Sequence, residues 1–314
     1  MRVGVIGYKR HAEKHINLIR NNYPQANLII YHPNKKLEQI TNIFEDILVS
    51  DFIIISSPTD THIFYIKQLA LKNFRGSIYL EKPGFNSIQE SYELEKIQAK
   101  FSLRITIGYH FPFETKIKKL KEIIDEKNTG ELISIDITMS KGIAYRDWFI
   151  NDWRKKDNLS ICHTGLSHTL SIFHFLTSQN IIKKNIETKI IFNKETEAYD
   201  TAFAFSKINK PIFKALFSWG SPLIDCKINI LSTNKLINLE NNNITVRSPR
   251  DTFDENNHFL PPEITYSEDF SNEGIKPAVL NFLEQSYALE KFDEKSFKNS
   301  INIGRLCLNP EIIN

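Results

Sequence analysis

The chain has 314 residues, of which 41% are hydrophobic and 25% charged, and its formal net charge is +3. This length exceeds the size at which a single core usually keeps growing, so we expect a globular protein of two domains. Basic and acidic residues are interspersed and nearly balanced, which excludes a concentrated field for nucleic acid or an anionic membrane. We therefore expect neither as a partner.

Hydropathy and cysteine content indicate the cellular compartment of the protein. The longest apolar runs, such as Phe52–Ile55, are far shorter than the roughly 18 residues of a membrane-spanning helix. The chain starts directly with the strand-like segment Arg2–Ile6, without a leader-type stretch. Cys162, Cys226 and Cys307 have neither zinc-site nor redox-dithiol spacing, so we expect them to be reduced and packed. Together these features predict a cytoplasmic protein.

The first third of the chain alternates short apolar strands with helical patterns, which is typical of βαβ units and a parallel sheet. The segment 52–56 shows no polar alternation, so we expect a central strand that is buried on both faces. The predicted strands are 2–6, 27–31, 52–56, 77–80 and 103–107, with helices between them.

The pattern changes after Gly108, where alternating stretches at 132–138 and 226–231 indicate a second, mainly antiparallel sheet. A polar, proline-bearing segment at 247–263 predicts a long surface loop. Further helices are predicted at 113–126, 164–177 and 275–290.

The expected fold is therefore α/β. A Rossmann-type dinucleotide-binding domain occupies residues 1–112. An α+β domain with a large open, mainly antiparallel sheet occupies residues 113–314, and we assign it to substrate binding and oligomerisation.

The turn after the first strand departs from the dinucleotide fingerprint G-x-G-x-x-G. Gly7 and Ala12 match its first and third positions, but Lys9 replaces the second glycine, where the backbone approaches the pyrophosphate most closely. Lys9 and Arg10 can instead neutralise a pyrophosphate at the helix amino terminus by side-chain charge. The alternative is a basic turn that no longer binds a dinucleotide.

The acidic residue that usually contacts the ribose of NAD is missing, because no Asp or Glu lies between Glu13 and Glu38. The polar and cationic segment 31–36, which includes His32, can accept a ribose phosphate, so the sequence slightly favours NADP over NAD. Solvated loop lysines explain the same residues equally well.

The third and fourth predicted strands end in two informative turns, Ser57-Pro58-Thr59-Asp-Thr-His62 and Glu81-Lys82-Pro83-Gly84. Ligands of open parallel sheets sit beyond the carboxyl ends of the strands, so Lys82 is expected in the ligand crevice. At about 5 Å from a nicotinamide cation, with an effective dielectric near 20, repulsion of about 3 kcal/mol lowers a lysine pKa from about 10.4 towards roughly 8. Such a lysine exchanges protons near neutral pH, whereas a structural lysine at a strand exit shows no such shift.

With Gly108-Tyr109 and the pair Trp153-Arg154 upstream of His168, these motifs resemble the Gfo/Idh/MocA oxidoreductases, the family of glucose-fructose oxidoreductase and inositol dehydrogenase. The resemblance covers nearly the whole chain. It implies hydride transfer between a nicotinamide and a sugar or polyol. It also implies a homodimer or homotetramer that forms through the outer face of the second sheet.

The resemblance implies roles for individual residues. Lys82 and His168 would be the catalytic residues that exchange the hydroxyl proton, and the bond between Lys82 and Pro83 is expected to be cis. The implied cofactor-binding residues are Gly7, Lys9, Arg10, His32, Ser57, Pro58, Thr59, His62, Glu81, Trp153 and Arg154.

Two positions depart from the family pattern. Many members carry an Asp three or four residues before the histidine, where this chain has Thr164 and Gly165, so the usual Lys-Asp-His set is reduced to Lys82 and His168. An arginine often found after the junction glycine-aromatic pair is also missing, because 110–113 reads His-Phe-Pro-Phe. The substrate is therefore poorly constrained.

The function that we predict is an NAD(P)-dependent dehydrogenase or reductase acting on a hydroxyl or ketone of a sugar or nucleotide-sugar. Two alternatives share the fold: a non-catalytic nucleotide-binding sensor or co-repressor, and an NAD-dependent glycosidase. We expect no metal, because Cys162, His163 and His168 lack a fourth ligand and the usual zinc spacing.

Overall fold

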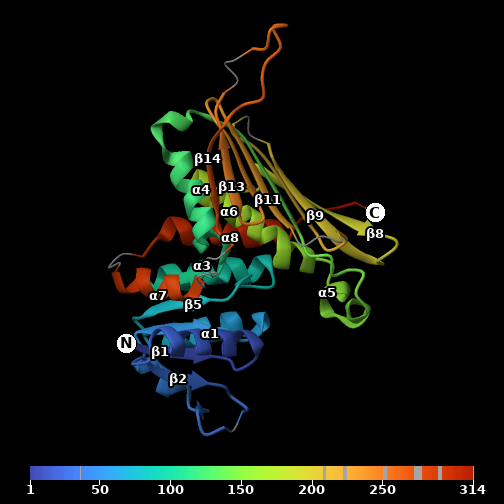
Figure 1. Ribbon diagram of the computed structural model, residues 1–314. Helices are drawn as coiled ribbons and strands as arrows, with labels where there is room; N and C mark the ends of the chain where they lie inside the picture. Colours follow the sequence, from blue (N-terminus) through green and yellow to red (C-terminus); the bar gives the residue numbers. More distant parts are fainter. Residues whose placement is uncertain are drawn as a thin grey trace. The chain divides into compact units, whose positions relative to one another are not determined.

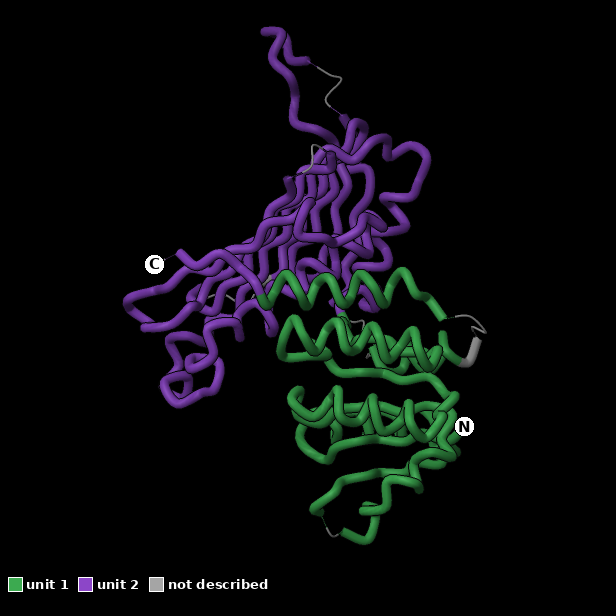
Figure 2. Tube along the Cα trace, turned by 180° about the vertical axis from the view of Figure 1, so that it is seen from behind, with its two compact units in different colours: residues 1–110, 276–308 green, residues 111–275, 309–314 purple. Residues whose placement is uncertain are grey.

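The computed structural model describes residues 1–35, 37–207, 210–221, 225–249, 253–271, 278–288 and 292–313. The chain forms two compact units, shown in different colours in Figure 2. The first unit comprises residues 1–110 and 276–308, and the second comprises 111–275 and 309–314. Each unit contains one sheet.

The first unit is built on a parallel sheet with the strand order β3-β2-β1-β4-β5-β6. Its strands are β1 (Arg2–Ile6), β2 (Asn27–Tyr31), β3 (Ile40–Thr41), β4 (Phe52–Ile55), β5 (Ser77–Leu80) and β6 (Arg104–Ile107). The chain runs outward from β1 to β3 and then returns to β4 on the other side of β1, which creates a topological switch point between β1 and β4. The predicted Rossmann-type sheet is confirmed, and the pattern missed only the two-residue β3.

Burial explains why these segments form the centre of the sheet. All four residues of β4 are buried, as expected for a parallel strand covered on both faces. The helices of this unit are α1 (Arg10–Asn22), α2 (His62–Leu71), α3 (Ile88–Phe101), α7 (Ala278–Ala288) and α8 (Glu294–Cys307), labelled in part in Figure 1. In α1 the buried residues Ala12, Ile16 and Ile19 lie three or four positions apart and form one apolar face.

The last two helices correct the predicted domain boundary. α7 contacts α1 and β5, with the Phe282 ring centroid 5.5 Å from that of Tyr79, while α8 contacts α3 and β6. Arg305 on α8 donates to Ser91 Oγ at 2.8 Å. A domain of 113–314 is therefore too long, because residues 276–308 belong to the first unit (Figure 2). Helical periodicity reveals an apolar face but not the sheet that it covers, so the pattern could not show this return.

The second unit contains a sheet with the order β14-β13-β12-β11-β7-β10-β9-β8-β15, in which only the pairs β7–β10 and β8–β15 are parallel among the described residues. The strands are β7 (Leu132–Ser140), β8 (Ile186–Asn193), β9 (Ala198–Ser206), β10 (Ile212–Ser218), β11 (Asp225–Ser232), β12 (Leu236–Glu240), β13 (Asn243–Arg247), β14 (Ile264–Asp269) and β15 (Glu311–Ile313). The predicted α+β architecture with a large, mainly antiparallel sheet is confirmed.

Helices cover one face of this sheet. They are α4 (Thr115–Asp125) and α6 (Ser167–Thr177), which Figure 1 shows beside the strands, while the short helix α5 (Trp153–Lys156) contacts β9. On β10, Phe213, Ala215 and Phe217 are buried, and Phe213 stacks on Phe173 of α6 with ring centroids 4.0 Å apart. The alternate residues Ile212, Lys214 and Leu216 are exposed on the other face. The sheet is therefore open on one side.

The short helical segments sit at the ends of these elements. They are η1 (Phe44–Val49), η2 (Thr59–Thr61), η3 (Phe111–Phe113), η4 (Lys127–Thr129), η5 (Asp147–Asn151) and the π-helical η6 (Cys162–Leu166). The helix predicted at 164–177 thus begins with a π-helical turn, and the described part of 248–263 lies between β13 and β14 as the predicted loop. No helix of the described residues is long and apolar enough to cross a membrane.

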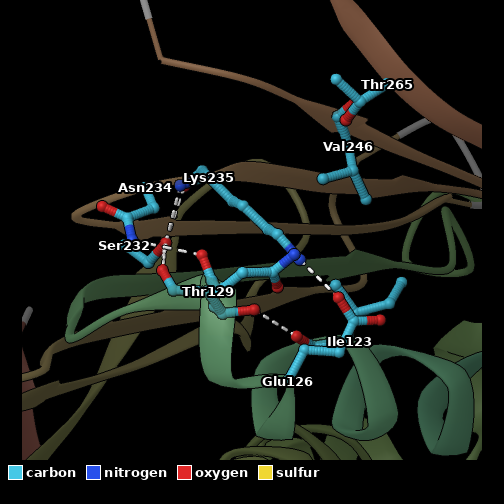
Figure 3. Close-up of polar contacts among 9 residues, drawn as sticks. Ile123, Glu126, Thr129, Ser232, Asn234, Lys235, Val246 and Thr265 are labelled. Atoms are coloured by element: carbon cyan, nitrogen blue, oxygen red, sulfur yellow. Dashed lines mark hydrogen bonds and ion pairs between the residues drawn. The ribbon is translucent and has the colours of Figure 1, made fainter.

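A polar cluster joins the end of α4 to the hairpin between β11 and β12 (Figure 3). Ser232 Oγ donates to the carbonyl of Thr129 at 2.7 Å and accepts from the backbone N–H of Lys235 at 2.9 Å. The Lys235 ammonium pairs with Glu126, and the Thr129 hydroxyl donates to the Ile123 carbonyl. These bonds satisfy the carbonyls left over at the helix end and hold α4 on the sheet.

Candidate functional site

Gly7 brings the ends of three strands together in the first unit. Its φ is +109°, and a Cβ at this position would lie 2.8 Å from the Ser56 carbonyl oxygen and 3.0 Å from the Ser57 nitrogen. Only glycine therefore fits between β1 and the exit of β4. The Gly7 N–H donates to the Tyr31 carbonyl at the end of β2, at 3.0 Å. The turn thus lies at the switch point of the sheet.

Helix α1 begins directly after this turn. Lys9 is its N-cap, in an extended conformation (φ −131°, ψ −179°) that any residue adopts, and its side chain makes no capping hydrogen bond. Replacing the fingerprint's second glycine with Lys9 therefore causes no backbone strain. Lys9 and Arg10 are exposed, whereas Ala12 is fully buried. The uncapped N–H groups and two cations form a setting that attracts an anion.

The exit of β2 adds further basic groups. His32 Nδ1 accepts a hydrogen bond from the Lys35 backbone N–H at 3.2 Å, and burial together with the charges of Lys35 and Lys9 lowers the pKa of His32. The Lys35 ammonium donates to the Tyr8 carbonyl at 2.8 Å and lies 4.6 Å from the centroid of the Tyr8 ring. Lys35 therefore braces the β1–α1 turn. Lys36 lies outside the described residues.

The turn after β4 is held by its own side chains. Thr61 Oγ1 donates to Ser57 Oγ at 2.7 Å, and His62 Nε2 donates to the Ser57 carbonyl at 3.0 Å. His62 is buried, and this burial lowers its pKa. Pro58 is exposed and Thr59 half-buried, so these two can meet a ligand while His62 supports the turn from inside.

The exit of β5 presents the carboxylate of Glu81, whose side chain is 18% exposed. Glu81 N–H donates to the Ile55 carbonyl of β4 at 3.0 Å, and Glu81 Oε1 accepts from His15 Nε2 at 2.7 Å. Burial by itself would raise the pKa of Glu81. The hydrogen bond from His15 and the charges of His15, His11 and Lys82 outweigh burial, so the pKa lies below its ordinary value. Glu81 is therefore ionised near neutral pH.

Lys82 follows Glu81 in a turn with an unusual backbone conformation. The peptide bond between Lys82 and Pro83 is cis, as predicted, and Gly84 has a φ of +89°. Burial raises the pKa of the Cys307 thiol on α8 to about 12, and the charge of Lys82 acts in the opposite direction. Lys82 thus lies within electrostatic reach of both Glu81 and Cys307.

His168 lies in the second unit, near the start of α6. It is 3% exposed, and its ring centroid is 4.8 Å from that of Phe111. Ile172 and Leu176 on the same helix are fully buried, as predicted. The imidazole is therefore buried, with the Phe111 ring beside it.

Packing excludes a carboxylate at Gly165, one of the two positions upstream of His168 where many family members carry aspartate. A Cβ added to Gly165 would lie 2.0 Å from the ring of Phe217 on β10, and Gly165 belongs to the π-helical turn. No side chain fits at this position without moving that ring. The chain therefore builds this helix with a close glycine-to-aromatic contact in place of a carboxylate.

Trp153 and Arg154 occupy the short helix α5 of the second unit. The guanidinium of Arg154 lies 4.9 Å from the centroid of the Trp153 ring, and Arg154 Nη1 donates to both carboxylate oxygens of Asp152 at 2.9 and 3.0 Å. Trp153 is 52% exposed. The pair thus presents an indole and an anchored guanidinium on the surface of α5.

The structure gathers most of the predicted cofactor residues at the carboxyl edge of the first sheet. These are Gly7, Lys9, Arg10, His32, Ser57, Pro58, Thr59 and Glu81, together with Lys82. Among the described residues, no group of three or more His, Cys, Asp or Glu could hold a metal ion. Cys162, Cys226 and Cys307 form no disulfide with one another, and Cys162 and Cys307 are buried while Cys226 is half-buried.

We compared the sequence of the chain with those of known proteins. No family model matches the chain. The glucose-6-phosphate 3-dehydrogenase of Bacillus subtilis (strain 168) is 24% identical over 160 residues, which are 50% of this chain and 45% of that protein. The chain spans about half the length, or less, of the curated relatives that it matches.

Solved structures match over nearly the whole chain. An oxidoreductase from Agrobacterium radiobacter in complex with NAD+, L-tartaric acid and magnesium has a TM-score of 0.76 at 15% identity, covering 98% of this chain and 94% of that one. The UDP-N-acetylglucosamine 3-dehydrogenase GnnA from Acidithiobacillus ferrooxidans has a TM-score of 0.70 at 14% identity, covering 98% and 95%. This chain has the Gfo/Idh/MocA fold. The resemblance seen in the motifs is thereby confirmed at the level of the fold.

Three residues near the carboxyl edge of the first sheet have contacts that the sequence did not predict. They are the histidines of α1, His11 and His15, whereas the third, Lys35, lies in the predicted segment 31–36 and only its contact with Tyr8 was not foreseen. The only sequence signal for the histidines was their spacing of four residues, which places both on one helix face. Their partner Glu81 is 66 residues away, so the contact itself had no local signature.

Proposed function

We propose that this protein is an NAD(P)-dependent oxidoreductase that transfers a hydride between the nicotinamide and a hydroxyl or ketone of a sugar or nucleotide-sugar. The observation that carries the proposal is the position of Lys82, at the carboxyl end of β5 beside the switch point of a Gfo/Idh/MocA fold. Structural neighbours with this fold include proteins in complex with NAD+ or NAD and a UDP-N-acetylglucosamine 3-dehydrogenase. The curated relative acts on glucose 6-phosphate according to its name.

The residues at the edge fit a dinucleotide. Gly7 allows the tight turn between β1 and the exit of β4, and the uncapped start of α1 that follows carries Lys9 and Arg10. These groups would hold the pyrophosphate, and Pro58 and Thr59 would contact the ribose and nicotinamide. When bound, the nicotinamide accepts or donates the hydride. Trp153 and Arg154 complete the proposed cofactor-binding set.

The cofactor preference follows from charge at the exit of β2. Lys9 and Lys35 both act electrostatically on His32, and an anionic ribose phosphate would relieve the repulsion among these groups. We therefore propose a preference for NADPH over NADH. Lys35→Met should weaken NADPH binding about tenfold more than NADH binding in fluorescence titrations, with Lys119→Met on α4 as a control. Equal losses for the two cofactors would contradict the preference.

Lys82 and His168 would exchange the hydroxyl proton. The carboxylate of Glu81 favours the charged form of Lys82, and a nicotinamide cation at about 5 Å opposes it by about 3 kcal/mol at an effective dielectric near 20. The lysine therefore releases its proton more readily once the oxidised cofactor is present. His168, as an imidazole that can both donate and accept a proton, would take the role of partner to the same hydroxyl.

The experiment has two stages. Purified protein is titrated with NADH and NADPH by fluorescence, and turnover is then measured with a panel of sugars and nucleotide-sugars. Lys82→Met and His168→Asn should each reduce kcat at least a hundredfold while cofactor affinity changes less than threefold. Lys67→Met on the exposed face of α2 is the matched control. Failure to bind either cofactor, or full activity of Lys82→Met, would refute the proposed function.

A second candidate function rests on the contact between Gly165 and Phe217. Because this contact leaves no room for a carboxylate at Gly165, and Thr164 stands at the other position where many members carry aspartate, the fold could serve as a non-catalytic nucleotide-binding sensor. Cofactor binding without turnover across the whole panel would favour the sensor.

For either function we propose a homodimer or homotetramer formed through the open face of the second sheet, where Ile212 and Leu216 are exposed.

A further inference from the structure

Helix α1 carries two histidines one turn apart, His11 and His15, and His15 reaches the exit of β5. Its Nε2 donates to Glu81 Oε1 at 2.7 Å, and its ring stands edge-on to Tyr79 with the centroids 5.9 Å apart. The side chains of His15 and Glu81 are only 12% and 18% exposed. The contact is thus largely shielded from water, where a charge-assisted hydrogen bond is strong.

Glu81 needs such a partner to remain charged. Burial opposes its ionisation, and the hydrogen bond from His15 is the strongest influence in the other direction. His11 and Lys82 contribute through charge alone, while Lys14 acts on His11. Among the described residues, Tyr79 on β5 and His62 on α2 also respond to the charge of Glu81.

The helix that supplies His15 is also the helix that begins at the phosphate-binding turn. Lys9 and Arg10 stand at its first turn, and His15 follows little more than one turn later. A single rigid element therefore connects the turn proposed to hold the pyrophosphate with the residue before Lys82. A carboxylate held from such an element is fixed in position as well as in charge.

We propose that His15 is a positioning residue, whose hydrogen bond holds Glu81 as a carboxylate beside Lys82 and thereby ties the proton-exchanging lysine to helix α1. The inference rests on the proposed function for the role of Lys82, but the state of Glu81 is measurable without turnover. Glu81 stabilises the ammonium form of Lys82, so the loss of the carboxylate lets Lys82 deprotonate at lower pH. In a His15→Leu variant, the acid limb of the pH profile of kcat/KM for hydroxyl oxidation should therefore shift to lower pH by about one unit.

The direct test is infrared spectroscopy of the carboxyl groups between pH 8 and pH 5. His15→Leu should give an additional protonated-carboxyl C=O band in this range, because burial of Glu81 is then no longer offset. His15→Gln, whose amide keeps a donor, should suppress that band, and Glu81→Gln in the His15→Leu background should remove it. His11→Leu is the comparison variant on the same helix face, and because His11 acts on Glu81 through charge alone, it should give a much weaker band than His15→Leu.

The outcomes separate this inference from the proposed function. A new carboxyl band in His15→Leu that Glu81→Gln abolishes supports the role of His15, even if the wild-type protein shows no turnover and the proposed function fails. Wild-type turnover with no such band and an unshifted acid limb in His15→Leu would overturn it. Should the leucine variant not fold, His15→Asn, whose shorter amide falls short of Glu81, provides the same readout with a polar side chain.

Discussion

Substitution of Gly165 by Ala tests the packing that excludes a carboxylate at this position. The new Cβ would lie 2.0 Å from a ring carbon of Phe217, whereas carbon atoms in contact normally stay about 3.5–4.0 Å apart. The ring must therefore move by about 1.5 Å inside a close-packed layer. Overpacking of this kind costs about 1–3 kcal/mol, so we expect Gly165→Ala to reduce the free energy of unfolding by that amount.

Urea denaturation of a double-mutant cycle measures this cost. In a Phe217→Leu background the smaller side chain leaves room for the methyl group, so Gly165→Ala should become nearly neutral, with a coupling energy of about 1–3 kcal/mol. Phe213→Leu, on the same face of β10 but stacked on Phe173, is the matched background in which the full cost should remain. Equal costs of Gly165→Ala in all three backgrounds would show that Phe217 is not what excludes a side chain at this position.

Three further predictions address other parts of the molecule. Gly7→Ala should destabilise the protein by about 2–4 kcal/mol in urea, because its positive φ and the approach of the Ser56 carbonyl both oppose a Cβ; an unchanged midpoint would contradict this. The pKa of Cys307 is raised from 9.0 to about 12, so its contribution to stability is intact below pH 9 and is lost as the pH rises towards 12. Between pH 8 and pH 10 the wild-type protein should lose about 1.4 kcal/mol more than Cys307→Ala in urea titrations, and equal losses would argue against the buried thiol. Leu216→Glu on the open sheet face should convert the proposed oligomer to monomers in light scattering, unlike Leu71→Glu on the exposed face of α2.

The features that sequence could predict are those encoded by neighbouring residues. The unbroken apolar run Phe52–Ile55 indicated a central parallel strand, and the Glu81-Lys82-Pro83-Gly84 exit followed from the end of the next strand. Alternation along β7 and β11 indicated the second sheet. In each case the period of the pattern reports directly on which faces are buried.

What escaped prediction depends on contacts between distant segments. Nothing local shows that α7 and α8 cover the first sheet, or that His15 meets Glu81. The π-helical turn at Cys162–Leu166 arises where Gly165 packs on Phe217, which is a property of two segments together. Single positions with apparent defects, such as Lys9 in the phosphate-binding turn, also needed the backbone conformation before they could be judged.

The return of the chain to the first unit has a consequence for the order in which the protein folds. The sheet of β1 to β6 lies within the first 110 residues, but α7 and α8, which cover β5 and β6, are made some 170 residues later. Until then the apolar face that receives Phe282 remains uncovered on a growing chain. Strand β15 pairs with β8 of the second unit later still, at residues 311–313. The residues of β15 are exposed, so it adds an edge strand and no core to the second unit. The first unit, in contrast, cannot complete its core until α7 and α8 have been made, so it should acquire full stability no earlier than the second unit.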